Sequence, residues 1–481
     1  MSDGTAGLRG AVEREVWPLV EQFGSTHEVA GLAVALVRGD EVVVRGFGVR
    51  DLRSGEPVTP ETMFHLASVS KPFVATAVVS LAHEGRLDLD EPVTAWVPEL
   101  TLADGRQDDV TARGLLSHTS GLPDVSEYGW HDPQLGDDAL SEFARSLTQW
   151  RLATDPGSRF SYSNAGYELL GLVLSRVSGT TFEDAMRQRL LSPLGMAAST
   201  FVRGEVPGEL ASSPHVGMPL TVPDAAYPYT RRHSPSSTMH ANLVELVRWV
   251  RAHWEPGGLA ASLVDLMSRP VAHIGEAPWD EEQSLGWALG TYAGHRTLSH
   301  SGADPGFGTR LVLVPDRRTG VVVLANSNTV LTSAIASVAL DIALDVPGGP
   351  GDGAVALRGP SPVVSAVART LARSGHDAAV AEYDRLAAEE PPRFDLDDDE
   401  FEKAVWGAIE LHRTDLVWPL LRVWAGVRPD SSTAWTMTGW AHQVDGDVDE
   451  ARRVLQHALD LDPHNEDAAL IAGNLSAQSR T

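Results

Sequence analysis

Segments with the sequence pattern of β-strands lie at the two ends of the region 31–325, and a long stretch without that pattern separates them. Two runs rich in β-branched residues, 31–37 and 41–47, flank Gly39-Asp40, a dipeptide typical of tight turns. Further runs follow at 285–292, 296–300, 309–314 and 320–325. Because strands must pair to be stable, we expect one antiparallel sheet built from distant segments, with helices on its faces and a helical insert. The predicted fold class is α/β (α+β).

Apolar residues recur at helical spacing in the remaining parts of this region. Helices are predicted at 8–23, 68–84, 139–150, 164–178, 181–191, 242–254 and 331–344. Pro72 falls in the first turn of the second of these helices. A proline is tolerated there because the amide that it lacks would have no partner within the helix.

The segment 345–362 separates two parts of the chain that differ in pattern. It holds five glycines and four prolines in 18 residues, which is typical of a linker, and no strand pattern occurs after it. We therefore predict three regions: an α/β region at 1–345, a linker at 346–362 and an all-α region at 363–481.

The all-α region resembles a series of tetratricopeptide repeats. Pro429 and Pro463 are 34 residues apart, which is the period of that repeat. The last unit carries residues of the expected size at the positions where the repeat packs its two helices: Trp435, Gly439, Ala451, Leu455 and Ala458. One departure is His442, which stands where an aromatic residue is usual. The resemblance implies a concave surface for a protein partner, and a generic helical bundle is the alternative.

The charge of the chain and its lack of cysteine exclude several functions. There are 65 acidic residues against 38 Lys plus Arg, a formal net charge of -27, so we expect no nucleic-acid binding. Without cysteine there is no disulfide, thiolate metal site or cysteine nucleophile. No apolar stretch reaches the ~20 residues of a membrane helix, and residues 1–12 lack the apolar core of a secretory signal. We therefore expect a cytoplasmic protein without membrane association.

Lysine is rare in this chain. Two of the 38 basic residues, Lys71 and Lys403, are lysines, and the others are arginines. An arginine keeps its charge in a protein, whereas a lysine can lose its proton, so a retained lysine is a candidate for a chemical role. Neither lysine follows a glycine, which excludes a phosphate-binding Walker loop.

Ser68 and Lys71 are spaced i, i+3 at the start of a predicted helix, so their side chains share one face. A serine hydroxyl needs a base to become a nucleophile, and a lysine in an apolar setting can accept its proton. The amides at a helix N-terminus favour the negative charge that develops in such a reaction. The alternative is a surface helix start in which Ser68 is the N-cap and Lys71 is solvated.

Two further motifs carry groups that such a reaction uses. The phenol of Tyr162 could relay protons, and the amide of Asn164, two residues on, could hold a substrate carbonyl. His300 ends a predicted strand, and Gly302 would let a substrate backbone approach, with the amide after it as an oxyanion donor. Each motif has a structural alternative: a core tyrosine, a helix-capping asparagine and a structural histidine.

The order S-x-x-K, Y-x-N and H-x-G resembles the serine β-lactamase and penicillin-binding protein superfamily. The similar branch contains class C β-lactamases, D-alanyl-D-alanine carboxypeptidases, D-aminopeptidases and related esterases. Flanking runs at 115–122 and 310–327 are also similar, and the resemblance covers about residues 29–344. It implies the β-lactamase/transpeptidase-like fold and a serine hydrolase that works through an acyl-enzyme, without a metal or other cofactor.

The resemblance also implies a role for the motif residues. Ser68 attacks a carbonyl, and Lys71 and Tyr162 share the general acid and base work. The amides of Ser68 and Ala303 form the oxyanion hole. Asn164 binds the acyl side of the substrate.

Two other histidines have different expected roles. His300 either polarises the region of Tyr162 or holds a substrate carboxylate. His118, within 115–122, is structural in the family, so we do not assign it to a catalytic triad.

Two departures from the family bear on the substrate. His300 stands where most β-lactamases have lysine, and the H-x-G form goes with peptidases and esterases, so we expect small esters or D-amino-acid-containing peptides as substrates. Ser236-Ser237 stands where relatives often carry two glycines, so we expect an altered cleft rim.

Several alternatives remain at this point. They are an acyltransferase or peptide-cyclising thioesterase of the same fold, a β-lactamase, and an adaptor that binds a partner through the helical tail. The chain has no G-x-S-x-G motif, which argues against an α/β-hydrolase, and no H-E-x-x-H motif, which argues against a zinc hydrolase.

Overall fold

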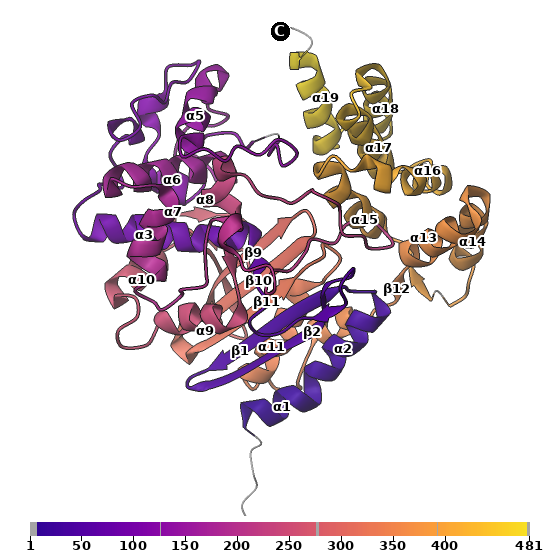
Figure 1. The fold of residues 1–481 in the computed structure, drawn as a ribbon, viewed down its shortest axis with the longest axis horizontal. Coiled ribbons are helices and arrows are strands. Elements are labelled where there is room, and N and C mark those ends of the chain that lie inside the picture. Colours follow the sequence, from indigo (N-terminus) through magenta and orange to yellow (C-terminus); the bar gives the residue numbers. More distant parts are fainter. Residues whose placement is uncertain (1–6, 126, 276–278, 392, 479–481) are drawn as a thin grey trace, which may run out of the picture.

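The computed structural model describes residues 7–125, 127–275, 279–391 and 393–478 (Figure 1). Residues 1–6, half of the N-terminal segment expected to lack a secretory signal, lie outside this part, as do the last three residues of the all-α region. Among the described residues, no helix combines the length and the apolar character needed to cross a bilayer.

Most strands of the α/β region form one sheet, and β4 (Phe64–His65) pairs separately with β5 (His240–Ala241). Within the described residues the large sheet has nine antiparallel strands in the order β3-β2-β1-β11-β10-β9-β8-β7-β6. The strands are β1 (Gly31–Arg38), β2 (Glu41–Asp51), β3 (Glu56–Pro57), β6 (Ala272–His273), β7 (Glu282–Gln283), β8 (Ala288–Tyr292), β9 (His295–Asp304), β10 (Phe307–Val314) and β11 (Thr319–Ala325). Because β1 pairs with β11, the two distant groups of strands join at the centre, and the predicted sheet is confirmed. The two-residue strands were not predicted, since they are too short to show an alternating pattern.

Alternate residues of β1 enter two different cores. The even-numbered side chains from 32 to 36 are buried with apolar residues of α1 (Leu8–Glu15), α2 (Trp17–Thr26) and α11 (Thr332–Ala343). The odd-numbered side chains from 33 to 37 are buried in the core of the helical insert on the other face. A strand covered on both faces has the continuous apolar run seen in its sequence.

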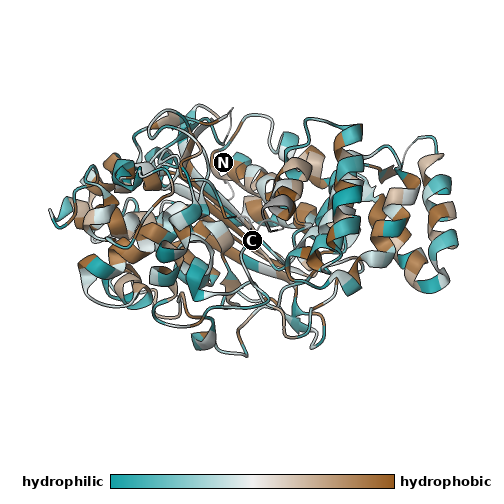
Figure 2. Cartoon of the chain, turned by 90° about the horizontal axis from the view of Figure 1, so that it is seen from above, coloured by the Kyte–Doolittle hydropathy of each residue, from teal (hydrophilic) through white to brown (hydrophobic). Residues whose placement is uncertain are grey.

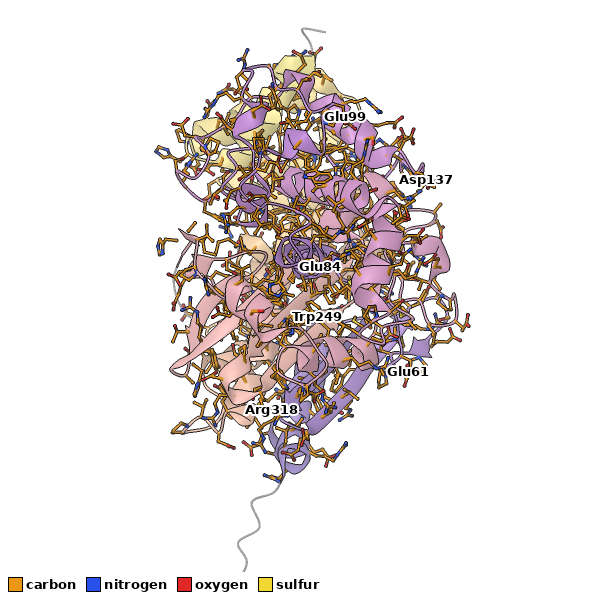
Figure 3. The ribbon with its side chains drawn as sticks, turned by 90° about the vertical axis from the view of Figure 1, so that its left-hand side faces the viewer. Glu61, Glu84, Glu99, Asp137, Trp249 and Arg318 are labelled. Atoms are coloured by element: carbon orange, nitrogen blue, oxygen red, sulfur yellow. The ribbon has the colours of Figure 1, made fainter. Side chains whose placement is uncertain are left out.

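The helical insert forms a lobe over one face of the sheet (Figure 1). Its helices are α3 (Ser70–His83), α4 (Ala112–Leu116), α5 (Ala139–Ser146), α6 (Asn164–Ser178), α7 (Phe182–Met186), α8 (Ser234–Ser237), α9 (Leu243–Ala252) and α10 (Ala261–Met267). Trp249 of α9, labelled in Figure 3, is fully buried. It stacks on Phe73 of α3 with ring centroids 4.2 Å apart. This contact holds α3, which begins two residues after Ser68.

Two predicted helices are interrupted. The helix expected at 8–23 divides at Val16 into α1 and α2. Pro18 lies at the start of α2 and has no N–H to donate to the preceding turn, so the first helix cannot continue. The helix expected at 181–191 is α-helical only in α7 and continues as a π-helical turn, Arg187–Leu191.

The segment predicted as a linker, 346–362, is partly ordered against the α/β region. It contains α12 (Asp352–Leu357), and Ala354 and Leu357 are buried in the same core as α11. The carboxylate of Asp341 accepts a hydrogen bond from the Gly351 amide at 3.0 Å. The glycines and prolines therefore let the chain follow the surface closely. The boundaries at 345/346 and 362/363 stay a prediction.

The C-terminal region is helical apart from one short strand pair, β12 (Ser361–Pro362) with β13 (Phe394–Asp395). Its helices are α13 (Val363–Ser374), α14 (His376–Ala387), α15 (Asp398–Glu410), α16 (Trp418–Val427), α17 (Ser432–Val444), α18 (Val448–Leu461) and α19 (Glu466–Gln478). A Cβ on Gly439 of α17 would lie 2.7 Å from the Leu455 side chain of α18, so these two helices approach as the repeat pattern predicts. The assignment to tetratricopeptide repeats stays a prediction.

The C-terminal helices pack against the α/β region. Trp130, Val216 and Met218 of that region are buried in one core with residues of α13 and α15. Gly407 of α15 has little room for a side chain, because its Cβ would lie 3.0 Å from Val216 and 3.1 Å from Asn328. Figure 2 shows hydrophobic residues along the strands of the sheet and alternating hydrophobic and hydrophilic bands on the C-terminal helices. The tail is therefore seated on the α/β region through an apolar face.

Candidate active site

Ser68 lies in a 3-10 turn, Ala67–Val69, that leads directly into α3. Ala67 has a left-handed backbone with φ of 49°, which turns the chain sharply before the serine. Leu66 donates its amide to the Met239 carbonyl at 2.8 Å, which anchors the turn. Ser68 is half-buried, whereas Ser70 is fully buried and its hydroxyl accepts from the Met239 amide at 3.0 Å. Ser68 is thus the accessible hydroxyl of this turn.

Lys71 is fully buried one helical turn after Ser68. Its Nζ donates to three oxygens: Ser68 Oγ at 3.0 Å, Asn164 Oδ1 at 2.5 Å and the Ser236 carbonyl at 2.9 Å. These contacts hold the amine against the serine hydroxyl. They exclude the alternative in which Lys71 is a solvated surface residue.

Asn164, the first residue of α6, is oriented by a loop that the sequence analysis did not single out. Asp124 accepts from the Asn164 backbone amide at 2.6 Å and from its Nδ2 at 2.9 Å. The Tyr128 hydroxyl accepts from the same Nδ2 at 2.5 Å. Because both partners hold the NH₂ group, the amide oxygen is left to face Lys71. No sequence pattern marks Asp124, since it meets Asn164 only through a loop.

Tyr162 lies above the lysine and rests on His118. The Lys71 amine is 5.0 Å from the centroid of the Tyr162 ring. The His118 ring stacks on the same Tyr162 ring, with centroids 4.3 Å apart. His118 Nδ1 accepts from the Ser163 amide at 3.1 Å. Burial, followed by the charge of Lys71, lowers the pKa of His118 well below its usual value. A neutral, buried imidazole that supports the 161–163 segment has the contacts of a structural residue, as expected.

Strand β9 brings the third motif to the same place. A Cβ on Gly302 would lie 2.6 Å from the Leu66 carbonyl and 2.9 Å from the Ser68 amide, so only glycine lets the strand approach the turn this closely. Ala303, the next residue, is exposed. At the end of β9, Asp304 bonds the buried His65 at 2.7 Å, which ties the strand to the segment before Ser68.

His300 of β9 is neutral in this structure. Burial, followed by the charges of Lys71 and Arg310, lowers the pKa of His300 to about 3. Its Nδ1 lies 2.6 Å from the Ser301 carbonyl. A carbonyl can only accept, so Nδ1 carries the ring proton and Nε2 is an acceptor. A neutral ring offers no positive charge to a substrate carboxylate.

A buried glutamate, Glu168, lies on the same helix as Asn164. Glu168 is fully buried and accepts from Ser236 Oγ at 2.6 Å, and the His233 ring lies 3.0 Å away. Burial raises the pKa of Glu168. The sequence carried a clue to this residue, because it is an acidic residue directly before the apolar run 169–174 of α6, four positions after Asn164. Ser236 and Ser237, expected at a cleft rim, are buried in α8 beneath Lys71 instead.

The motif residues open onto a cleft of about 580 Å³. Residues of the α/β region line most of it: Ser68, Tyr162, His300, Ser301, Gly302, Ala303, Gly308, Thr309, Asn328, Val330 and Thr332. The remaining lining residues come from α15 in the tail: Asp399, Glu402, Lys403 and Trp406. The tail therefore forms one wall of the cleft. Lys403 lies on this wall, and Lys71 contacts Ser68 of the same cleft.

The α15 wall is acidic. Lys403 is paired with Glu400 at 2.7 Å, and the acidic residues Asp399 and Glu402 line the cleft beside it. Burial, followed by the charges of Asp467 and Asp399, raises the pKa of Glu402. The predicted motif residues thus come together at one place. The sequence analysis missed the acidic wall, because the linker-like composition of 346–362 suggested that the tail lies apart from the α/β region.

The comparisons with known proteins agree with this geometry. The family model described as Beta-lactamase matches residues 18–343. Protein flp of Staphylococcus aureus (strain MW2) is 26% identical over 323 residues, which is 66% of this chain and 64% of that protein. Esterase EstB of Burkholderia gladioli is 32% identical over 296 residues, covering 54% of this chain and 74% of that protein.

Solved structures share the fold. The octameric penicillin-binding protein homologue from Pyrococcus abyssi has a TM-score of 0.63 at 24% identity, covering 76% of this chain and 82% of that one. SurE has a TM-score of 0.60 at 26% identity, covering 71% and 78%. A class C β-lactamase has a TM-score of 0.57 at 22% identity, covering 72% and 97%.

The fold is of the β-lactamase type. The chain belongs to the Beta-lactamase family.

Proposed function

We propose that the protein is a serine hydrolase that forms an acyl-enzyme on Ser68 and acts on small esters or on D-amino-acid-containing peptides and amides. One observation carries the proposal. The amine of Lys71 is buried and lies 3.0 Å from Ser68 Oγ, which itself opens onto the cleft. In its neutral form, after its own proton has left, a lysine held in this way can take the serine proton as the hydroxyl attacks.

The proposed reaction has two halves. Ser68 Oγ attacks the substrate carbonyl carbon and gives its proton to Lys71, and the oxyanion that forms is stabilised by the amides of Ser68 and Ala303. The bond to the leaving oxygen or nitrogen breaks as Lys71 and Tyr162 return a proton to it. Water then attacks the ester on Ser68, and the same groups move the proton in reverse. Asn164 orients the Lys71 amine and binds the acyl side of the substrate.

The charge of the cleft favours neutral or cationic substrates over β-lactams, which carry a carboxylate. The neutral His300 offers a hydrogen-bond acceptor, and the α15 wall adds Asp399 and Glu402. An acidic wall attracts an amino group and repels a carboxylate. Trp406 on the same wall offers an aromatic face to an apolar or cationic substituent.

Two relatives support this choice of substrate. One is named an esterase, EstB, and SurE has been solved with D-Leu. Because the chain spans only 64% of the length of flp, the activity of that whole protein is not carried over.

The test is a panel of p-nitrophenyl esters, D- and L-amino-acid p-nitroanilides and a chromogenic cephalosporin, combined with fluorophosphonate labelling and peptide mass mapping. We expect label on Ser68, turnover of esters or D-amino-acid amides above that of the cephalosporin, and loss of both in Ser68→Ala. Ser192→Ala is the matched control, because Ser192 is an exposed serine outside the cleft.

Several results would contradict parts of the proposal. Label on Ser70, or active protein without label, would remove Ser68 from its role. Cephalosporin turnover above ester turnover would overturn the substrate order. Amide products formed on addition of an amine would favour the acyltransferase alternative, and an inert but folded protein would favour the adaptor.

A further inference from the structure

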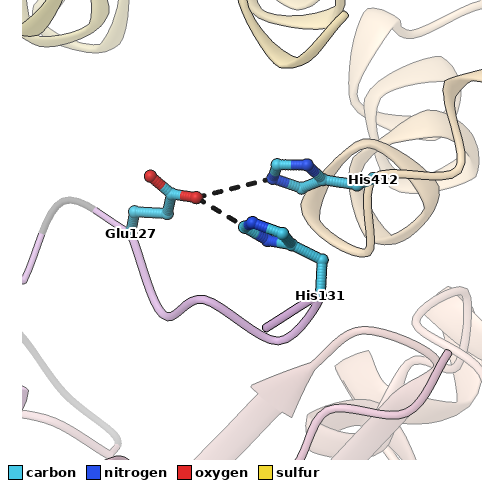
Figure 4. A group of neighbouring side chains, drawn as sticks. All are labelled: Glu127, His131 and His412. Atoms are coloured by element: carbon cyan, nitrogen blue, oxygen red, sulfur yellow. Dashed lines mark ion pairs between the residues drawn. The ribbon is translucent and has the colours of Figure 1, made fainter. Parts of the chain in front are cut away.

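A second cluster of chemically active side chains lies away from Ser68, where the tail meets the α/β region. Glu127 and His131 come from the loop after α4, and His412 comes from the tail, immediately beyond α15 (Figure 4). Glu127 Oε1 lies 3.5 Å from His412 Nε2 and 3.8 Å from His131 Nδ1. The two imidazole rings stack with centroids 3.7 Å apart.

These separations are close to those of a metal site. Two ligand atoms bound tetrahedrally to Zn²⁺ at ~2.1 Å lie roughly 3.4 Å apart. The three donor atoms of the cluster all lie within 4.8 Å of one another. Small rotations of these partly exposed side chains would therefore bring all three to bonding distance. Two imidazoles and one carboxylate, with water as the fourth ligand, suit Zn²⁺ better than the oxygen-preferring Mg²⁺ or Ca²⁺.

The backbone at His412 gives a separate indication. His412 has a φ of 55°, and the Arg413 amide bonds the Ala408 carbonyl at 2.8 Å, which is the left-handed ending of a helix that glycine usually occupies. A histidine in this position costs stability that glycine would not.

We propose that Glu127, His131 and His412 bind one Zn²⁺ that joins the tail to the α/β region. The site would also fix the loop that orients Asn164, because Asp124 and Tyr128 belong to the same loop as two of the ligands. The metal takes no part in the chemistry of Ser68, so this inference stands independently of the proposed hydrolase activity.

The test uses the untagged full-length chain, freed of metal with EDTA and then titrated with ZnCl₂ by isothermal titration calorimetry. We expect one Zn²⁺ per chain and a rise in Tm of roughly 2–3 °C at a Zn²⁺ concentration about 100 times Kd. His131→Ala and His412→Gly should each weaken binding at least tenfold and remove the rise in Tm.

His412→Gly separates the loss of a ligand from damage to the fold. Glycine accepts the left-handed backbone, so the metal-free variant should be at least as stable as the metal-free parent. His464→Ala, which removes an exposed histidine elsewhere in the tail, should keep the response to Zn²⁺. The proposal fails if no saturable binding is seen, or if the His131 and His412 variants bind Zn²⁺ like the parent.

Discussion

Gly302→Ala tests whether the close approach of β9 to the Ser68 turn supports the reaction. The new Cβ would lie 2.5 Å from Thr309 Oγ1, 2.6 Å from the Leu66 carbonyl and 2.9 Å from the Ser68 amide, whereas ordinary contacts begin at 3.4 Å. Two of these three atoms are backbone, so side-chain rotation cannot relieve the overlap. The strand and the turn must separate by roughly 0.5–1 Å, at a cost of about 1–3 kcal/mol in stability.

The same separation displaces the amide of Ala303 from that of Ser68. Because loss of one oxyanion donor costs about 10²–10³ in rate, we expect single-turnover acylation by a p-nitrophenyl ester to fall by about that factor. Stopped-flow absorbance measures the acylation, and the Tm reports the stability. Gly24→Ala is the matched control, since its Cβ meets nothing within 4 Å and α2 should gain up to ~1 kcal/mol. Acylation by folded Gly302→Ala within about threefold of the parent would refute the reasoning.

Three further predictions follow from other parts of the structure. Lys71→Arg should fold but lose acylation by at least ~100-fold, because arginine cannot accept the serine proton. Lys403→Arg keeps the pair with Glu400 and should retain normal acylation. Near-normal acylation by Lys71→Arg would pass the base role to Tyr162. Trp406→Ala should raise KM several-fold with a smaller change in kcat, and an unchanged KM would remove α15 from the substrate wall. Burial lowers the pKa of His253 from 6.5 to about 4, so the stability it contributes is present above pH 6.5 and is lost as the pH falls toward 4. The fall in Tm between pH 7 and pH 4.5 should be smaller in His253→Leu, and equal slopes would contradict this assignment.

The fold was largely predictable because its strands are long enough to show their periodicity. β1, β10 and β11 are buried on both faces, and their apolar runs are plain in the sequence. Strands β3, β6 and β7 have two residues each and carry no pattern. The end of α1 at Val16 depends on a missing backbone donor at Pro18, which periodicity alone does not detect.

The candidate site divides in the same way. Ser68 and Lys71 lie within one helical turn, so their spacing in the chain is also their spacing in the molecule. Asp124 meets Asn164 across 40 residues through a loop, and no local pattern anticipates that contact. Glu168 could be singled out because it stands beside an apolar run of α6, whereas no local pattern marks its hydrogen-bond partner Ser236.

The sequence alone determined the apolar run of β1, the helix that carries Lys71 one turn after Ser68, and the identity of the three motifs. All of these rest on contacts between neighbours in the chain, which spacing records directly. Only the tertiary structure decided that α15 closes the cleft and that His412 meets Glu127. The linker-like composition of 346–362 suggested separation, yet the apolar face of α15 packs Gly407 against Val216, because burying that face is more favourable than leaving it in water. Such contacts depend on the shape of two surfaces that the chain brings together only once both have folded.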